Sequence, residues 1–568
     1  MRVLIALGAL GALAACYQPT VTSCQYACGA GNSCPDGQSC TNGFCVAPGD
    51  TCTGSSGGSD MAPATPTQMS PANGIYTGSL TAPGSLTPTF HWAGVADAVY
   101  YELDLDPTCS KLPCTFPDGQ ITHVTPIDGT SYTPPSKLTV SQVQPVGQRY
   151  GWRLRACNSI GCSDWSAARY LNVGRLRDDL DGDGRSELAI GCEETPTISI
   201  EDVNPQTQGL TSLIQCGPSG GEMYFGTAIV VGDFNGDGYA DLAAGGQHAS
   251  PPGDVTVVEG GSGIECTAAD ETVIPAPGDA TAFGQQIASV GDLDGDGYDD
   301  LVVFELTSTG RTLELYFGSA LGLDTMHPVA IPVAMSKSFS LVLVSGTGDI
   351  DGDGYLDAAF STGSASAPSA VAIVPGNATR QFAVTTTLTE PATSSYGDQI
   401  AILDLDGDGL ADVFVSALDD TADSVGHVFA YHATPTGLVS WMDFTSSQSS
   451  NRFGGAGLLP IMAGSAAELA IADEGNPVTI IDASLGLPVN VVSDPGNPDD
   501  DDFGQALGGG DALGTGLTTL VVGATTDSES GSAFVCPRAS ADPSSFTCSV
   551  VADPHPSGDD EFGISLSP

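Results

Sequence analysis

The sequence predicts an all-β protein whose larger part is a repeated unit. The 73 glycine and 38 proline residues supply many tight turns, which favour short strands over long helices. Apolar and polar residues alternate in short runs such as Tyr101–Leu105, with the two-residue period of a half-buried strand. From Phe225 onward, an aromatic residue followed by a small one returns every 50–59 residues. A period of this length, with several short strands per unit, indicates a propeller or another repeat array.

Charge and composition exclude some classes of function. Acidic residues number 68 against 15 basic ones, which gives a formal net charge of −53. Such a chain lacks the basic surface that binds nucleic acid and is poorly suited to an anionic membrane surface, so we expect no nucleic-acid partner. The apolar fraction of 41% argues against disorder, and 568 residues allow about three or four domains.

The start of the chain reads as a targeting signal. Residues 1–15 contain the apolar run Val3–Ala15, which suits a signal peptide and is too short to span a bilayer. The run ends in Leu13–Cys16, which resembles a bacterial lipobox and implies cleavage before Cys16 and its lipidation. The alternative is an ordinary secretory signal with a chance cysteine.

A lipid anchor would tie this acidic protein to a membrane without a spanning helix. Tyr17, rather than aspartate, follows the cysteine. By resemblance to lipoprotein sorting, this favours the outer membrane of a Gram-negative bacterium. We therefore expect a protein of the cell envelope whose only membrane contact is its anchor.

Residues 16–52 form a cysteine-rich module after the anchor. Its six further cysteines are Cys24, Cys28, Cys34, Cys40, Cys45 and Cys52. A zinc site is disfavoured because no Cys-x-x-Cys occurs and residues 17–60 contain no histidine. Three disulfides, in one of about fifteen pairings, would hold together a segment too small for a core. The module is loosely similar to an epidermal-growth-factor-type domain, and residues 53–69 follow as a flexible linker.

Residues 70–174 are predicted to form a β-sandwich, with alternating runs such as Trp152–Ala156 bounded by turn residues. The segment resembles a fibronectin type III domain. The matching residues are Trp92, Tyr100, Tyr101, Tyr150, Trp152, Arg153, Ala156, Asn158, Gly161, Trp165, Ser166 and Tyr170–Val173. Four cysteines depart from that family, which usually lacks disulfides: Cys109, Cys114, Cys157 and Cys162. We interpret this domain as a spacer between the membrane and residues 175–568.

Five acidic segments in residues 175–568 share one template, and their first residues are 54, 59, 57 and 55 positions apart. Positions 1, 3, 5 and 9 of the template carry oxygen-bearing side chains, and position 6 is glycine. The candidate ligands are Asp179, Asp181, Asp183 and Glu187; Asp233, Asn235, Asp237 and Asp241; Asp292, Asp294, Asp296 and Asp300; Asp349, Asp351, Asp353 and Asp357; and Asp404, Asp406, Asp408 and Asp412.

This spacing predicts calcium, about one ion per loop. Carboxylates at these positions converge on one hard cation, the glycine permits a sharp turn, and the position-7 carbonyl completes an oxygen shell. An EF-hand would need glutamate at position 12, where the loops have Ile190, Ala244, Val303, Phe360 and Val415. The alternative of solvated acidic turns is disfavoured because five loops share one register.

The aromatic motif precedes the loops and continues beyond them. Its members are Phe225-Gly226, Phe283-Gly284, Phe339-Ser340, Tyr396-Gly397, Phe453-Gly454, Phe503-Gly504 and Phe562-Gly563. Together the two motifs resemble the FG-GAP repeat of the integrin α-subunit β-propeller. The resemblance implies a seven-bladed propeller with calcium in loops near the rim of one face. We expect one blade to begin near Tyr170 and the stub Phe562–Leu566 to return to it. Blades six and seven lack the acidic cluster, with Asp511 alone, so calcium there is doubtful.

The disulfide pairing of the cysteines in residues 175–568 is only partly predicted by their spacing. Cys536 and Cys548 are spaced to join a hairpin, whereas Cys192, Cys216 and Cys266 leave one odd thiol.

We predict a surface-anchored binding or adhesion protein whose propeller presents a docking face for a protein or glycan. The alternative is an extracellular polysaccharide hydrolase or lyase, because a propeller does not fix function. Neither His-Glu-x-x-His nor a Walker-type Gly-Lys-Ser/Thr occurs, and we assign no catalytic residue. Only Trp441 of the four tryptophans lies in the propeller segment, which counts modestly against stacking on glycans.

Overall fold

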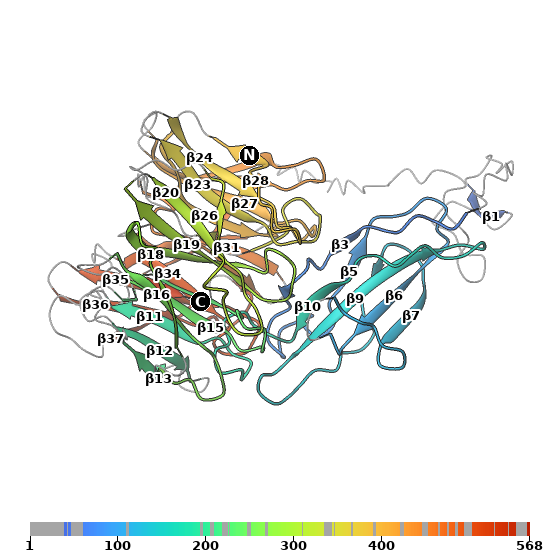
Figure 1. Ribbon diagram of the computed structural model, residues 1–568, viewed down its shortest axis with the longest axis horizontal. Coiled ribbons are helices and arrows are strands. Elements are labelled where there is room, and N and C mark those ends of the chain that lie inside the picture. The colour runs from blue at the N-terminus through green and yellow to red at the C-terminus, as the bar shows by residue number, and fades with distance from the viewer. Residues whose placement is uncertain are drawn as a thin grey trace, which may run out of the picture.

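The computed structural model describes residues 39–41, 44–46 and 61–567 apart from internal segments. Those segments are 110–112, 193–196, 205–209, 218–224, 227, 247–251, 267–270, 309, 334–343, 346, 365–366, 390–392, 421–424, 446–451, 464–465, 474–475, 483–486, 494–502, 527–528, 543–544 and 553–564. The described residues form β-strands and no α-helix (Figure 1). No membrane-spanning helix is found among them.

Several predicted features lie outside the described residues. They include the signal segment, Cys16, most of the cysteine-rich module, residues 53–60 and the aromatic motifs at Phe339 and Phe562. Within the module, strands β1 (Ser39–Thr41) and β2 (Phe44–Val46) form an antiparallel hairpin.

Residues 68–173 form two sheets that face each other, as the sequence predicts for a sandwich. The larger sheet has the order β4 (Ile75–Tyr76), β10 (Arg169–Val173), β9 (Gln148–Cys157), β6 (Tyr100–Asp106) and β7 (Thr122–Ile127). The smaller sheet pairs β3 (Gln68–Ser70), β5 (Phe90–Trp92) and β8 (Ser131–Tyr132). Phe90 and Trp152 are fully buried between the sheets, with ring centroids 5.0 Å apart.

The rest of the described chain forms seven sheets, most of them four-stranded antiparallel meanders. The first contains β11 (Leu188–Cys192), β12 (Thr197–Val203), β13 (Leu210–Cys216) and β38 (Ser565–Ser567). The second contains β14 (Ala228–Gly232), β15 (Asp241–Gly246), β16 (Asp254–Val258) and β17 (Glu271–Pro275). The third contains β18 (Ala280–Gly291), β19 (Asp300–Thr307), β20 (Arg311–Tyr316) and β21 (Val329–Ile331).

The remaining four sheets continue the pattern. The fourth contains β23 (Ala358–Ser364), β24 (Ala367–Val374) and β25 (Thr386–Leu388). The fifth contains β26 (Thr393–Leu403), β27 (Asp412–Asp420), β28 (Val425–His432) and β29 (Val439–Thr445), with β22 (Val344–Ser345) parallel to β26. The sixth contains β30 (Gly457–Ala463), β31 (Ala466–Ala472), β32 (Val478–Asp482) and β33 (Leu487–Val492). The seventh contains β34 (Phe503–Gly510), β35 (Thr519–Thr526), β36 (Glu529–Cys536) and β37 (Ser549–Ala552).

The hydrophobic core of this part lies between successive sheets. One cluster joins Val302 of the third sheet to Phe360 of the fourth, and another joins Ile190 of the first sheet to Val521 of the seventh. The first and last sheets therefore pack against each other. Each sheet buries apolar side chains on both faces, which explains why runs such as 301–304 are continuously apolar rather than alternating.

The first sheet corrects one expectation from the sequence. Tyr170 does not begin a propeller unit, because it lies in β10 of the sandwich and pairs with β9. The expected return of the C-terminal stub is confirmed, because β38 pairs with β11, with Leu566 opposite Ile190. The strand that the repeat lacks at its start is thus supplied by its C-terminus.

The aromatic–glycine motif has a structural explanation. Its five described aromatics are at most 2% exposed, and the glycines that follow them have φ values of 73–92°. This left-handed conformation is costly for residues with a Cβ. The motif therefore marks a buried anchor followed by a turn in each repeat.

Four disulfides are described. They join Cys109 to Cys114, Cys157 to Cys162, Cys216 to Cys266 and Cys536 to Cys548. The predicted hairpin disulfide is thus confirmed, and the pairing left open among three cysteines is between Cys216 and Cys266.

Candidate metal-binding loops

The five acidic loops each lead directly into a strand of one of the first five sheets: β11, β15, β19, β23 and β27. In the second sheet, for example, β14 ends at Gly232, the loop begins at Asp233, and β15 begins at Asp241, the ninth loop residue. Loops two, three and five thus connect two antiparallel strands of one sheet. The first loop follows β10 of the sandwich and the fourth follows β22 of the fifth sheet, and none of the described residues on either side of a loop is helical. This arrangement confirms that the loops are not EF-hands, which require flanking helices.

Two glycines bend each loop in the same way. The glycines at position 4 have φ values of 73–80°, and those at position 6 have φ values of 92–103°. These conformations strongly favour glycine. The sequence predicts the need for glycine at position 6, but the same need at position 4 was not predicted.

Backbone amides hold the first three carboxylate positions. In every loop, one oxygen of the position-1 aspartate, Oδ2, accepts a hydrogen bond from the position-6 amide at 2.8–3.1 Å. The position-3 side chain accepts from the position-5 amide at 2.9–3.1 Å. The position-5 side chain accepts from the position-7 amide at 2.9–3.2 Å. These bonds aim the side chains into a common concave site.

The position-9 carboxylate fastens each loop to its sheet. One of its oxygens accepts from the position-2 amide at 2.6–3.3 Å in all five loops. In loops two to five, the other oxygen accepts at 2.9–3.0 Å from the amides of Gly260, Gly318, Gly376 and Ala433, respectively. Position 9 thus has a structural role that the ligand pattern alone did not reveal.

Ligand atoms converge in these loops. Within 4.8 Å of one another lie oxygens of Asp179, Asp181, Asp183 and Glu187, of Asp292, Asp294 and Asp300, and of Asp349, Asp351 and Asp353. In the fifth loop, the corresponding group contains Asp406, Asp412 and an imidazole nitrogen of His432. In the second loop, Asp233 and Asp237 are close enough to raise the pKa of Asp241, after the larger effect of its burial.

Several of these carboxylates are buried, which is costly for an isolated charge. Asp179, Glu187 and Asp233 are 4%, 1% and 4% exposed, and one oxygen of each accepts no hydrogen bond from the described residues. Burial raises the pKa of Asp179 to about 8 and that of Asp233 to about 7, because the charged form loses its hydration. A hard cation would satisfy these orphaned oxygens, so the residues present fit calcium.

Three basic side chains of the same repeats also reach the loops. Arg185 donates to Asp183, Arg380 donates to Asp294 and to Asp296, and His432 Nδ1 lies 3.0 Å from Asp412 Oδ1. The sequence argument missed all three. Arg185 is position 7 of the first loop, so its proximity to Asp183 could have been predicted from the sequence. Arg380 follows Asp296 by 84 residues, so its contact could not.

The loop of the seventh sheet keeps the turn without the acidic cluster. Both oxygens of Asp511 accept backbone hydrogen bonds, from Thr515 at 2.7 Å and Gly516 at 2.6 Å. Positions 3, 5 and 9 are Leu513, Thr515 and Thr519. A single carboxylate is a poor calcium site. In the sixth sheet, Ala463 at the end of β30 pairs with Ala466 at the start of β31, so no nine-residue acidic loop separates these two strands.

Comparison with protein families supports the repeat assignment. A model of the FG-GAP-like repeat matches residues 179–244 and 346–415, and a model of the FG-GAP repeat matches residues 283–312. These segments contain all five acidic loops.

Integrin α subunits are among the similar curated proteins. The chain is 27% identical to integrin alpha-PS2 of Drosophila melanogaster over 214 residues, 31% identical to integrin alpha-4 of Xenopus laevis over 168 residues, and 31% identical to human integrin alpha-IIb over 156 residues. The matches cover 34%, 27% and 24% of this chain, and it spans only 15% of the length of each relative.

Solved structures give a fainter likeness. A protein from Lactobacillus plantarum matches with a TM-score of 0.40 at 12% identity over 67% of this chain and 98% of its own. A putative 6-phosphogluconolactonase from Bacteroides fragilis matches with a TM-score of 0.40 at 10% identity over 67% and 96%. Neither likeness is close enough to carry an argument. The sequence matches, in contrast, show that this chain carries FG-GAP repeats and is similar there to the integrin α-subunit β-propeller.

Proposed function

We propose that the chain is a lipid-anchored, calcium-stabilised binding protein of the cell surface. In this proposal, its seven sheets are the blades of a β-propeller that presents a docking face for a protein or glycan. The pairing of β38 with β11 supports ring closure, as does the core shared by the first and seventh sheets. The two-sheet domain before it would be a fibronectin type III-like spacer, and Cys16 would carry the anchor in an outer membrane.

The observation that carries the proposal is the set of five loops with one geometry inside integrin-like repeats. Two of the loops bury carboxylate oxygens that have no hydrogen-bond donor among the described residues. The template of each loop supplies four oxygen-bearing side chains and one carbonyl as candidate ligands, which would nearly fill the shell of a structural calcium ion. All four side chains converge in the first loop, and three converge in the third and in the fourth. This use of the acidic residues supports a role in binding or adhesion over a role in catalysis.

Anchoring is tested by fractionating cells that express the wild-type chain or Cys16→Ser. The wild type should sediment with outer membranes and incorporate labelled fatty acid, whereas the variant should do neither. A variant that still sediments with membranes after a salt wash would contradict the lipid anchor.

Binding is tested by exposing the immobilised chain to envelope proteins and glycans in calcium or EDTA. We expect saturable, calcium-dependent retention of a defined protein or glycan. The enzyme alternative is tested on the same material with glycosidase, esterase and phosphatase substrates. Robust turnover that is lost when a carboxylate outside the loops is replaced would overturn the binding role.

A further inference from the structure

The sandwich lies directly on the face that carries the acidic loops (Figure 1). Two backbone hydrogen bonds cross this contact: Val146 N donates to Gly182 O of the first loop at 2.9 Å, and Asn73 N donates to Gly354 O of the fourth loop at 3.0 Å. Gly354 also lies against the guanidinium of Arg169. The loop face is therefore covered, at least in part, by the preceding domain.

Side chains complete the contact at the other loops. A Cβ added at Gly184 of the first loop would lie 2.9 Å from Val146 of the sandwich, and one at Gly409 of the fifth loop would lie 3.1 Å from Ser70. At the second loop, a Cβ on Gly238 would lie 2.7 Å from Arg175, which follows the last sandwich strand. The absence of a side chain at position 6 thus allows the sandwich to approach these loops closely, and it also permits the loop turn.

The third loop receives the most specific contacts. Tyr170 donates its hydroxyl hydrogen to Asp292 Oδ2 at 2.6 Å, and both side chains are 1% exposed. Arg149 donates from Nη1 to Gly297 O at 2.7 Å, and its guanidinium lies 4.4 Å from the centre of the Tyr170 ring. Gly297 O belongs to the peptide just before Tyr298, whose carbonyl occupies position 7 of the template.

The hydrogen-bond pattern indicates which oxygen of Asp292 would face an ion. In all five loops, Oδ2 is the oxygen that accepts from the position-6 amide. In Asp179 and Asp233, the oxygen without a partner among described atoms is Oδ1. Tyr170 binds Oδ2, the anchored oxygen, and so fixes the direction of Oδ1. In Asp292, Oδ1 accepts one hydrogen bond, from the Asp296 amide at 2.9 Å, and its second lone pair remains for an ion.

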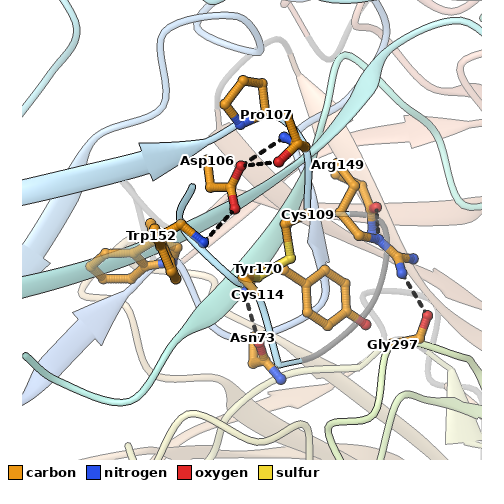
Figure 2. Close-up of a disulfide and its surroundings, with 12 residues drawn as sticks. Asn73, Asp106, Pro107, Cys109, Cys114, Arg149, Trp152, Tyr170 and Gly297 are labelled. Atoms are coloured by element: carbon orange, nitrogen blue, oxygen red, sulfur yellow. Dashed lines mark hydrogen bonds between the residues drawn. A yellow bond between two sulfur atoms is a disulfide. The ribbon is translucent and has the colours of Figure 1, made fainter. Parts of the chain in front are cut away.

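The sandwich holds these two side chains rigidly. Tyr170 and Arg149 lie on neighbouring strands, β10 and β9, with Tyr170 opposite Gly151 in the register. A Cβ at Gly151 would meet Cys114 Sγ at 2.4 Å, so the missing side chain makes room for the Cys109–Cys114 disulfide. Figure 2 shows Tyr170 beside that disulfide and Arg149 reaching Gly297.

We propose that Tyr170 and Arg149 are positioning residues of the third metal loop, so that calcium binding there is coupled to docking of the sandwich. The inference rests on the calcium role in the proposed function. Residues that hydrogen-bond to a metal-ligating group typically change metal affinity by about 10- to 100-fold. Coupling is reciprocal, so calcium in the third loop favours the docked sandwich by the same factor.

The direct test compares Tyr170→Phe with the wild type in the full chain, by calcium titration calorimetry after removal of EDTA and by elemental analysis. Tyr150→Phe is the matched control, since its hydroxyl donates at 2.6 Å to Thr139 O inside the sandwich. We expect Tyr170→Phe to weaken one calcium site by about 10-fold or more and to leave the others unchanged. The control should bind like the wild type.

The outcomes separate the two proposals. A wild-type chain that binds no calcium overturns the calcium assignment and the coupling with it. Calcium binding that is normal in the wild type and identical in Tyr170→Phe overturns the coupling alone.

A second measurement needs no variant. Amide hydrogen exchange at Asn73 and Val146, the donors that cross the contact, should be slower with calcium than with EDTA. Exchange at Leu138, which donates to Leu86 O within the sandwich, should not change. Equal protection of Asn73 and Val146 in both conditions would overturn the coupling.

Discussion

Chelation of calcium should remove most of the stability of this protein. Extracellular calcium sites bind with a Kd of about 0.1–1 mM. At this affinity, about 10 mM calcium stabilises each occupied loop by about 1.4–2.7 kcal/mol. Five loops together would contribute about 7–14 kcal/mol, which is comparable to the whole unfolding free energy of a typical domain, about 5–15 kcal/mol.

Without calcium, the chain should become less stable as the pH rises, whereas the calcium-loaded chain should become less stable as the pH falls. Burial raises the pKa of Asp179 to about 8, that of Asp233 to about 7 and that of Asp349 to about 6, from the ordinary 3.8. Without metal, the folded state keeps protons that the unfolded state releases. The stability from these groups is therefore full below about pH 4 and is lost as the pH rises through about 6 to 8. With calcium, acid instead protonates the ligands and weakens binding.

Scanning calorimetry at pH 5 and pH 8, in calcium or EDTA, tests both points. We expect EDTA to lower the Tm strongly at pH 8 and much less at pH 5, with full recovery when calcium is restored. An identical Tm with and without EDTA at pH 8 would refute the reasoning. At that pH, removal of bound calcium should leave repulsion between the carboxylates of the five loops and so lower the Tm.

Two further predictions concern single sites. Asp292→Ala combined with Asp296→Ala should lower the Tm in calcium and remove one metal equivalent by elemental analysis, and an unchanged stoichiometry would reject these ligands. Glu468→Gln should lower the unfolding free energy in urea by about 3–5 kcal/mol, because it leaves a buried cation unpaired. The side chains of Arg538 and Glu468 are 0% and 2% exposed and form two hydrogen bonds of 2.7 and 3.0 Å. Replacement of the exposed Glu259 by Gln should have almost no effect, and an equal loss in both variants would reject the ion-pair argument.

The acidic loops could be predicted from the sequence because all the residues that form each loop are close together in the chain. All ligand types, both glycines and the following strand lie within about a dozen consecutive residues, so spacing alone predicts convergence. The aromatic–glycine motif was readable for the same reason. It marks the same buried turn in each repeat, and its period counts the units.

The remaining features depend on contacts between distant residues. No local pattern brings Arg380 to Asp296 or Tyr170 to Asp292, which are 84 and 122 positions apart. The sequence around Tyr170 predicts both the last sandwich strand and the start of a propeller blade, because its apolar pattern is compatible with each. The expected return of the C-terminal stub to the first sheet, in contrast, is confirmed by the pairing of β38 with β11.

Several of the few basic residues of this acidic chain lie at the loops. Arg149 and Arg169, from the sandwich, are 5% and 6% exposed, whereas the side chains of Arg185 and Arg380, from the repeats, are 23% and 42% exposed. Exposed ion pairs contribute little and are screened by salt, but buried ones are screened much less. Salt should therefore weaken the contacts of Arg185 and Arg380 while leaving those of the sandwich largely intact. The two buried arginines, Arg149 and Arg169, can hold the two domains together over a wide range of salt concentration, because the strength of their contacts depends on the geometry of the loops more than on the surrounding electrolyte.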